Sequence, residues 1–256
     1  MENHYIYHKD DISWSLFADK YTGFSESYDL LSDIASVLDE VRWVFSETFE
    51  PETIKAHPIL SVLHCEDGPI TYRKRMLIFL SSRGRYYINH IYQFAHELCH
   101  FMVTEDTVDE YRWLNETLCQ MMSWYAMNYI YESRNDRKLE QLSSLYEKMP
   151  SYINDVMEDR DDLHGESIAK YIQQNLTHLQ NSGEDRRKNN TIAYEIYPLF
   201  REHTELWKIV PFLDQLKSGM TLPDALRTLC NAANIPSDVL DLLTQRLCEQ
   251  PPVAPQ

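Results

Sequence analysis

Residues 92–102 read YQFAHELCHFM and contain the pattern His-Glu-x-x-His at His96, Glu97 and His100. On an α-helix, two residues four apart lie one above the other on the same face, where two imidazole nitrogens can bind one zinc ion. Glu97 lies on the neighbouring flank, from which its carboxylate can take a proton from a metal-activated water. The stretch therefore predicts a zinc-binding helix with His96 and His100 as ligands and Glu97 as general base.

The distribution of charge around this stretch supports a role for Glu97. Between residues 86 and 104, Glu97 is the only charged residue when histidines are counted as neutral. A helix so poor in charge is expected to be buried, and a buried carboxylate is costly without a partner. A metal ion with its water is such a partner. The alternative is a structural helix with two hydrogen-bonded histidines; in either case Asn89 is expected to be the N-cap.

A second uncharged helix is expected to supply the third ligand. Residues 107–110 match a capping box, and residues 117–131 carry no charge. Glu116 stands at the start of that uncharged stretch, as the last residue of the sequence WLNE. An isolated carboxylate that faces an apolar region is typical of a metal ligand. A site of this type needs three protein ligands and an open fourth position, so Glu116 is the predicted third ligand.

Other acidic residues nearby are weaker candidates. They lie at a loop and a helix start, where the helix dipole favours acids and solvent surrounds them: Glu105, Asp106, Asp109 and Glu110. The long metzincin pattern would require a histidine at position 106 and a glycine at position 103, but the residues there are Asp106 and Val103. We therefore expect these acids to be solvated on the surface and not to bind a metal.

Together the two segments resemble the gluzincin metallopeptidases, and most closely the zinc aminopeptidases related to leukotriene A4 hydrolase. The resemblance covers residues 86–125 and rests on HELCH at 96–100 and WLNE at 113–116. It implies a zincin fold, in which a short sheet lies over the site helix and its edge strand pairs with extended substrate. The aminopeptidase segment Gly-x-Met-Glu-Asn is absent, so exopeptidase and endopeptidase cleavage both stay open.

The resemblance also implies roles for individual residues. It maps the ligands of one Zn²⁺ per chain onto His96, His100 and Glu116, and the general base onto Glu97. Gluzincins supply a Tyr or His from the C-terminal lobe to stabilise the oxyanion. Three residues are open candidates for that role: Tyr194, Tyr197 and His203.

Composition predicts a mostly helical α+β protein. The chain has 256 residues, 43% of them hydrophobic, and only 6 glycines. Such a chain can bury a sizeable core as one domain or two closely packed lobes. We expect a small sheet with the HExxH helix and the ligand helix, followed by a helical C-terminal lobe. The predicted division is a zincin-like catalytic region over residues 1–180, the lobe over residues 181–250 and a disordered tail over residues 251–256.

Hydrophobic spacing predicts several further helices. Apolar residues recur at helical spacing over residues 27–49, 137–148 and 167–180. The sequence from Pro236 onward predicts the start of the last helix. The longest polar run, residues 181–190, is expected to be a mobile loop or a lobe boundary.

Two apolar runs predict strands of the small sheet. They cover residues 59–63 and 76–80 and flank a turn signal at residues 66–69. Residues 1–25 show little periodicity. The basic residues 73–75 precede the second strand, where a solvated strand start is favoured over substrate binding.

Charge and targeting signals restrict the possible partners. The formal net charge of −16 argues against a nucleic-acid surface. No signal peptide and no membrane span is visible, so we expect neither a membrane nor a nucleic acid as partner. The five cysteines are odd in number and irregularly spaced, which favours free thiols in the reducing cytoplasm.

The predicted function is that of a zinc-dependent metallopeptidase acting on a peptide or protein substrate. Peptide-bond hydrolysis would use a metal-activated water, with Glu97 as general base. Two alternatives remain. One is a zinc-binding regulatory or interaction protein derived from a peptidase, and the other is a metallohydrolase of a non-peptide bond. The substrate, the cleavage site and the oligomeric state are not determined by the sequence.

Overall fold

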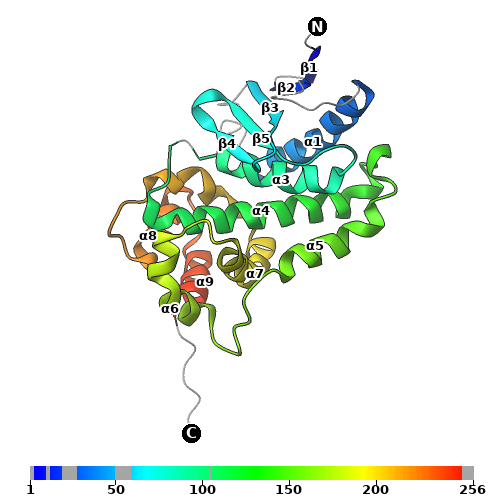
Figure 1. Cartoon of the computed structure of the whole chain (residues 1–256). Helices are drawn as coiled ribbons and strands as arrows, with labels where there is room; N and C mark the ends of the chain where they lie inside the picture. Colours follow the sequence, from blue (N-terminus) through cyan, green and yellow to red (C-terminus); the bar gives the residue numbers. More distant parts are fainter. Residues whose placement is uncertain (1–2, 10–11, 19–27, 50–58, 104, 250–256) are drawn as a thin grey trace. The chain divides into compact units, whose positions relative to one another are not determined.

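The protein is mostly helical with one small sheet, as predicted for an α+β fold (Figure 1). The structure is a computed structural model, and it describes residues 3–9, 12–18, 28–49, 59–103 and 105–249. The chain divides into two compact units. The first comprises Met1–Met102 and Met122–Asp155, and the second comprises Val103–Met121 and Val156–Gln256.

The sheet of the first unit has five strands in the order β1-β2-β3-β5-β4. Their bounds are β1 Asn3–Lys9, β2 Ile12–Ala18, β3 Ile59–His64, β4 Ile70–Tyr72 and β5 Leu77–Leu80. The three central strands β2, β3 and β5 are parallel, and the outer strands β1 and β4 each pair antiparallel with their neighbour. The two predicted strands are confirmed as β3 and β5. The sequence did not predict β1, β2 or the three-residue β4.

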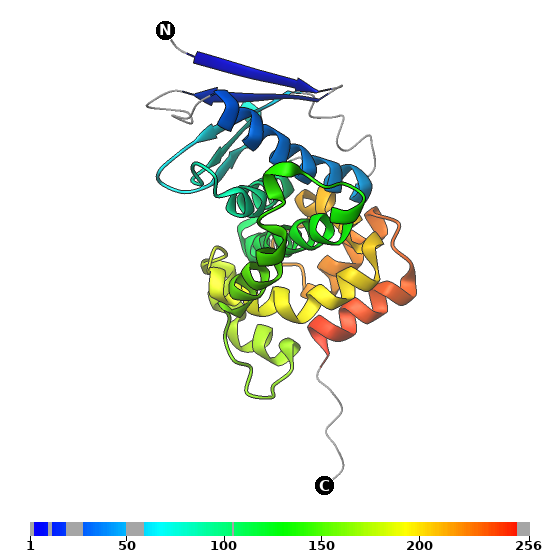
Figure 2. The same cartoon turned by 90° about the vertical axis from the view of Figure 1, so that its right-hand side faces the viewer.

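Two helices pack against the sheet from one side (Figure 2). Helix α1 (Tyr28–Thr48) contacts β1 and β2, and helix α3 (Tyr87–Phe101) contacts β4 and β5. The two helices also contact each other. The predicted helix over residues 27–49 is confirmed as α1, because its apolar positions form one buried stripe. That stripe includes Ile34, Val37, Leu38, Val41 and Phe45.

The predicted helix over residues 137–148 is wrong. This segment forms short 3₁₀ turns instead, η4 (Glu140–Leu142) and η5 (Tyr146–Lys148). Its side chains bind partners elsewhere: Arg137 donates two hydrogen bonds to Glu40, at 3.2 and 3.0 Å. The hydroxyl of Tyr146 accepts a hydrogen bond from the main-chain N–H of Leu139 at 3.1 Å. These contacts replace the regular helical pattern that the sequence spacing suggested.

Helix α4 (Arg112–Glu132) begins in the second unit and ends in the first. Its uncharged stretch is buried on nearly every side, as expected for a helix without charge. Two hydroxyls inside it donate to main-chain carbonyls, one in α4 itself and one in α3. The Thr117 hydroxyl donates to the Trp113 carbonyl at 2.7 Å, and the Ser123 hydroxyl donates to the Tyr92 carbonyl at 2.9 Å.

The second unit is built from helices, and helix α5 (Met149–Glu158) leads into it from the first unit. Its elements are α6 (Ile168–Asn181), α7 (Arg186–Glu202), η6 (Thr204–Gln215), α8 (Leu222–Ala232) and α9 (Ser237–Cys248). They pack on one another around apolar side chains. The core includes Ile192, Ile196, Phe200, Trp207 and Leu229. The predicted helix over residues 167–180 is confirmed as α6, and the predicted start of the last helix is confirmed as that of α9.

The polar run 181–190 is not a long loop, contrary to the prediction. Helix α7 begins within it, and the Asp185 carboxylate caps the helix by accepting from the Lys188 N–H at 3.2 Å. Asn189 and Asn190 are buried, and their amides donate to main-chain carbonyls of Gly183 at 2.7 Å and Asp159 at 2.9 Å. The mobile-loop prediction is wrong because several of these polar side chains bind main-chain groups inside the fold, and the alternative of a lobe boundary stays a prediction.

The predicted boundary after residue 180 falls in the last turn of α6. The division into a catalytic region and a C-terminal lobe stays a prediction, and residues 251–256 lie outside the described residues. Among the described helices, none combines the length and the apolar character that crossing a membrane requires. All five cysteines are free thiols, as predicted.

Candidate metal centre

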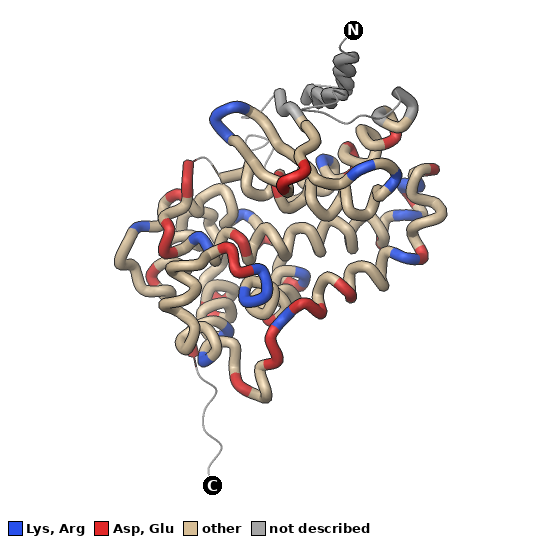
Figure 3. The backbone as a smooth tube through the Cα atoms, viewed as in Figure 1, with Lys and Arg blue, Asp and Glu red and all other residues tan. Residues whose placement is uncertain are grey.

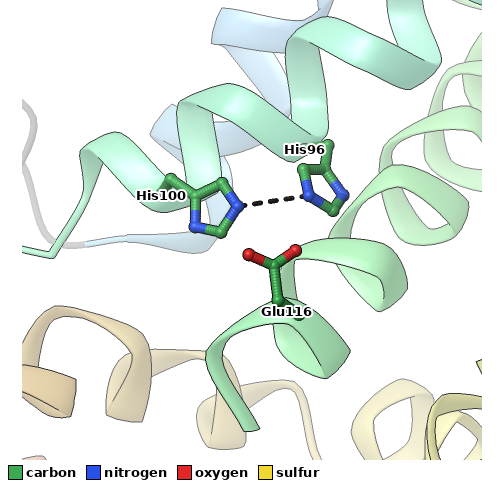
Figure 4. A group of neighbouring side chains, drawn as sticks. All are labelled: His96, His100 and Glu116. Carbon is green, nitrogen blue, oxygen red and sulfur yellow. Dashed lines mark hydrogen bonds between the residues drawn. The ribbon is translucent and has the colours of Figure 1, made fainter. Parts of the chain in front are cut away.

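The imidazoles of His96 and His100 face each other across one turn of α3 (Figure 4). Their Nε2 atoms are 3.2 Å apart, and the ring planes are inclined by 72°. Both side chains are half-buried. The carboxylate of Glu116, on α4, points toward both rings in Figure 4. Each of the three residues offers one ligand atom, and these atoms all lie within 4.8 Å of one another.

This arrangement fits a tetrahedral zinc site. Two nitrogens bound at about 2.0–2.1 Å to a tetrahedral ion lie roughly 3.3–3.4 Å apart. The observed separation of the two Nε2 atoms is 3.2 Å. Two imidazoles and one carboxylate are also a donor set that suits zinc. Within the part of the chain that the structure describes, no other group of three or more such side chains meets the same criterion.

The histidines are positioned by a helix whose other faces are buried. Phe94, Ala95 and Cys99 have no exposed surface, so the rotation of α3 about its axis is fixed by packing. The turn before the helix is held by Gln93, whose Oε1 accepts from the N–H groups of Ser81 at 3.0 Å and Ser82 at 2.9 Å. Asn89 is not the N-cap: it lies inside α3 and accepts a hydrogen bond from the Tyr152 hydroxyl at 3.2 Å.

Glu97 is buried and is fixed by the edge strand of the sheet. Only 4% of the residue is exposed. The Thr71 hydroxyl, on β4, lies 2.8 Å from Glu97 Oε2 and 2.9 Å from the Glu97 carbonyl oxygen. A hydroxyl has one proton, so these two acceptors share it. Glu97 is not part of the group of three ligand atoms, and its role as general base stays a prediction.

Sequence reasoning missed Thr71. It lies 26 residues before Glu97 and belongs to no recognisable motif. The nearby Arg73 was expected to be solvated, but its Nη1 donates to the main-chain carbonyl of His100 at 3.2 Å. Both contacts depend on the position of β4 beside α3, which no local pattern in the sequence reveals.

The start of α4 holds Glu116 in place. Trp113 and Leu114 are buried, and the Asn115 amide donates to the Thr107 hydroxyl at 3.1 Å. The predicted capping box at residues 107–110 is therefore wrong, because η2 (Asp109–Tyr111) precedes α4 and the Thr107 hydroxyl serves Asn115.

A close approach from the loop between α6 and α7 also fixes the first turn of α4. A Cβ atom at Gly183 would lie 2.7 Å from the Cβ of Arg112 and 2.9 Å from the N of Trp113. A glycine is therefore needed at that point. The neighbouring Glu184 forms an ion pair with Arg112 at 2.8 Å.

The competing acids lie outside the group of ligand atoms. Glu105, Asp106 and Asp109 are exposed. Glu110 accepts from the Gly219 N–H at 2.7 Å and the Ser218 hydroxyl at 2.8 Å. These two hydrogen bonds hold the pKa of the Glu110 carboxyl below its usual value.

The three candidate oxyanion donors have different surroundings. Tyr194 is exposed, and the Arg160 guanidinium lies 3.7 Å from the centre of its ring. Tyr197 is buried in α7, and His203 lies 3.5 Å from the carboxylate of Glu205. Tyr197 is thus part of the helical core, whereas Tyr194 and His203 reach solvent.

Two further histidines of the first unit, His64 and His90, lie outside the His-Glu-x-x-His pattern. His64 and His90 are both buried. The Arg83 guanidinium donates from Nε to His64 Nε2 at 2.7 Å, and His90 Nε2 lies 3.1 Å from the Gly84 carbonyl oxygen. Burial lowers the pKa of His64, and the Arg83 charge lowers it further. Burial lowers the pKa of His90 from 6.5 to about 4. Both shifts favour the neutral form of the imidazole.

Comparison with known proteins adds no assignment to this geometry. The chain matches no family model, and neither the curated proteins nor the solved structures contain a match to it. The interpretation of the site therefore depends on its residues alone.

Proposed function

We propose that the protein is a zinc-dependent metallopeptidase, in which His96, His100 and Glu116 bind one zinc ion and Glu97 is the general base. One observation carries the proposal: two imidazole nitrogens and a carboxylate, from two different helices, converge within 4.8 Å. Three donors leave room for a fourth ligand at a tetrahedral ion, which is the property that separates catalytic from structural zinc sites.

When bound, zinc supplies Lewis acidity, which polarises a carbonyl group and lowers the pKa of water. The work of the chain is to move protons. Glu97 takes the proton from the attacking water as the new C–O bond forms. It then gives a proton to the leaving amine as the C–N bond of the peptide breaks. The hydrogen bond from the Thr71 hydroxyl to Oε2 would orient the carboxylate for this transfer.

The edge strand β4 supports an extended peptide as the substrate. It pairs with β5 on one side, and its residues Ile70 and Tyr72 are each 43% exposed. An unpaired strand edge can add a further strand through main-chain hydrogen bonds. Thr71, between those two residues, contacts the proposed base, so a peptide on this edge would lie beside Glu97.

We place this activity in the cytoplasm. The five free cysteines fit a reducing compartment, in which thiols stay reduced.

The decisive experiment measures metal content and peptide cleavage together. Purified protein should contain about one zinc per chain and should cleave members of a broad peptide library. Glu97→Gln should keep the zinc and lose the cleavage. If wild type cleaves no peptide but binds partners as well as Glu97→Gln does, the protein is a zinc-binding interaction protein. If wild type instead hydrolyses an ester or another non-peptide bond, it is a different metallohydrolase.

A further inference from the structure

We infer that β4 and the basic turn after it select extended peptides carrying acidic side chains. We define the basic turn as Arg73, Lys74 and Arg75. This inference rests on the proposed peptidase function and deepens it by naming the class of substrate. Four features of the first unit carry it: an open strand edge, a fixed basic turn, a contrast of charge along the strand, and the contacts that strand and turn make with α3.

The open edge belongs to a strand whose other side is already paired. Residues Ile70, Thr71 and Tyr72 pair with Phe79, Ile78 and Leu77 of β5. In the described ranges no strand pairs with the opposite side of β4. With alternating side chains, Thr71 turns toward α3 while Ile70 and Tyr72 face solvent. The free edge thus offers main-chain hydrogen bonds with apolar side chains on one face.

The basic turn is held in a defined position. Residues 73–75 form a 3₁₀ turn that ends at Met76, which has a left-handed backbone with φ of 54°. Arg73 donates to the His100 carbonyl at 3.2 Å, and Arg75 lies 5.9 Å from the centre of the Tyr72 ring. Lys74 and Arg75 are exposed. Among the residues that the structure describes, neither forms an ion pair within the chain.

The turn is a run of three basic residues in an acidic protein. The chain has 24 Lys and Arg against 40 Asp and Glu, with a net charge of −16. Figure 3 shows the basic tip between β4 and β5. The opposite end of β4 follows Glu66, which forms an ion pair with Arg83, and the exposed Asp67. A bound peptide would therefore meet two exposed cations at the turn and the Asp67 carboxylate at the other end of the strand, which favours acidic side chains beside the turn.

The contacts with α3 set the distance from the reacting bond. Thr71 binds Glu97, and Arg73 binds the carbonyl of His100. The turn thus lies beyond Thr71 in the direction in which β4 runs. Because a strand advances about 3.3 Å per residue, the preferred acidic side chain should be about two or three residues from the cleaved bond.

The test uses Glu97→Gln, which should bind peptides without cleaving them. Fluorescent alanine-rich octapeptides carry one Glu, Gln or Lys at each position in turn, and dissociation constants are measured by anisotropy. The best Glu peptide should bind about tenfold more tightly than its Gln counterpart, since each exposed ion pair contributes roughly two- to fivefold. That preference should shrink in high salt, because surface charges are screened.

Charge reversal of the turn supplies the matched comparison. Lys74→Glu/Arg75→Glu, made in the Glu97→Gln background, should lose the preference for Glu and gain one for Lys. The control Lys148→Glu/Lys217→Glu changes the net charge equally at two exposed residues that belong to neither β4 nor the basic turn, and it should keep the preference for Glu. Zinc content and thermal unfolding establish that each variant is folded.

Two outcomes separate this inference from the proposed function. If wild type cleaves peptides without preferring acidic ones, or the control variant changes as much as the turn variant, the inference is wrong and the peptidase proposal stands. If acidic peptides bind through the turn but wild type never cleaves them, the peptidase proposal fails. The turn then remains a site for an acidic partner segment.

Discussion

The two pairs of histidines in the first unit use the same side chain in opposite ways. His96 and His100 are half-buried and turn their Nε2 atoms toward each other at 3.2 Å. His64 and His90 are buried and turn Nε2 toward other groups, the Arg83 guanidinium and the Gly84 carbonyl. A histidine becomes a candidate metal ligand only where its nitrogen faces other possible ligand atoms and solvent can reach it. The surroundings decide its role, and the residue type does not.

The two pairs of histidines also differ in the charge that their surroundings favour. A neutral imidazole is required at His90, because burial opposes the protonated form and lowers its pKa to about 4. The pair on α3 instead has the carboxylate of Glu116 close to both rings, which favours positive charge between them. Burial thus favours the neutral form at His90, whereas the pair on α3, together with Glu116, forms a group that could hold a cation.

The largest expected effect distinguishes the pairs by metal content. His96→Ala, His100→Ala and Glu116→Ala should each reduce zinc from about one per chain to nearly none, because two remaining ligands bind zinc weakly. The matched control His64→Asn should keep full occupancy. Inductively coupled plasma mass spectrometry of purified variants measures this. Full occupancy in Glu116→Ala together with loss in Asp106→Ala would overturn the choice of third ligand.

The next effect separates binding the metal from moving the proton. Glu97→Gln keeps the size of the side chain but removes its basicity, so the zinc content should not change. Peptide cleavage should fall by about 10²–10⁴-fold, the usual contribution of a general base. Steady-state kinetics on the best library peptide measures the loss. Cleavage at the wild-type rate would remove Glu97 from the mechanism.

The buried pair should give the protein an acid sensitivity of its own. The pKa of His90 is about 4 in the folded protein and 6.5 when unperturbed. As the pH falls below 6.5, the unfolded state takes up the proton first. The stabilising effect of neutral His90 is therefore complete above pH 6.5 and is lost progressively towards pH 4, by about 3 kcal/mol in total.

Urea unfolding at pH 7 and pH 4.5 measures this loss. His90→Gln is the informative variant, because its amide can still donate to the Gly84 carbonyl but cannot be protonated in this range. The free energy of unfolding should depend less on pH in the variant than in wild type. The same pH dependence in both proteins would show that other groups cause the acid sensitivity.

The smallest expected effect concerns the residue that positions the base. Thr71→Val removes the hydroxyl at nearly constant volume, so kcat should fall about tenfold, as expected for a lost hydrogen bond to a charged group. Thr71→Ser should restore most of the rate, and KM and zinc content should change little in either variant. A fall in stability with no change in kcat would give Thr71 a purely structural role.

The sequence by itself determined the local features of the site. Spacing of four residues on a helix places His96 and His100 on one face whatever the rest of the fold does. The scarcity of charge in both helices predicted their burial, because burying unpaired charge is costly. The same local reasoning predicted α1, β3, β5 and α6, whose patterns of apolar residues are complete within each segment.

Only the tertiary structure decided which distant groups meet. Thr71 reaches Glu97 because β4 lies beside α3, and the Thr107 hydroxyl binds Asn115 instead of capping a helix. The segment 137–148, which was predicted as a helix, forms short 3₁₀ turns, and its first residue, Arg137, binds Glu40 far away in the chain. The physical reason is that a buried polar side chain needs a hydrogen-bond partner, and the folded chain can supply that partner from any sequence distance.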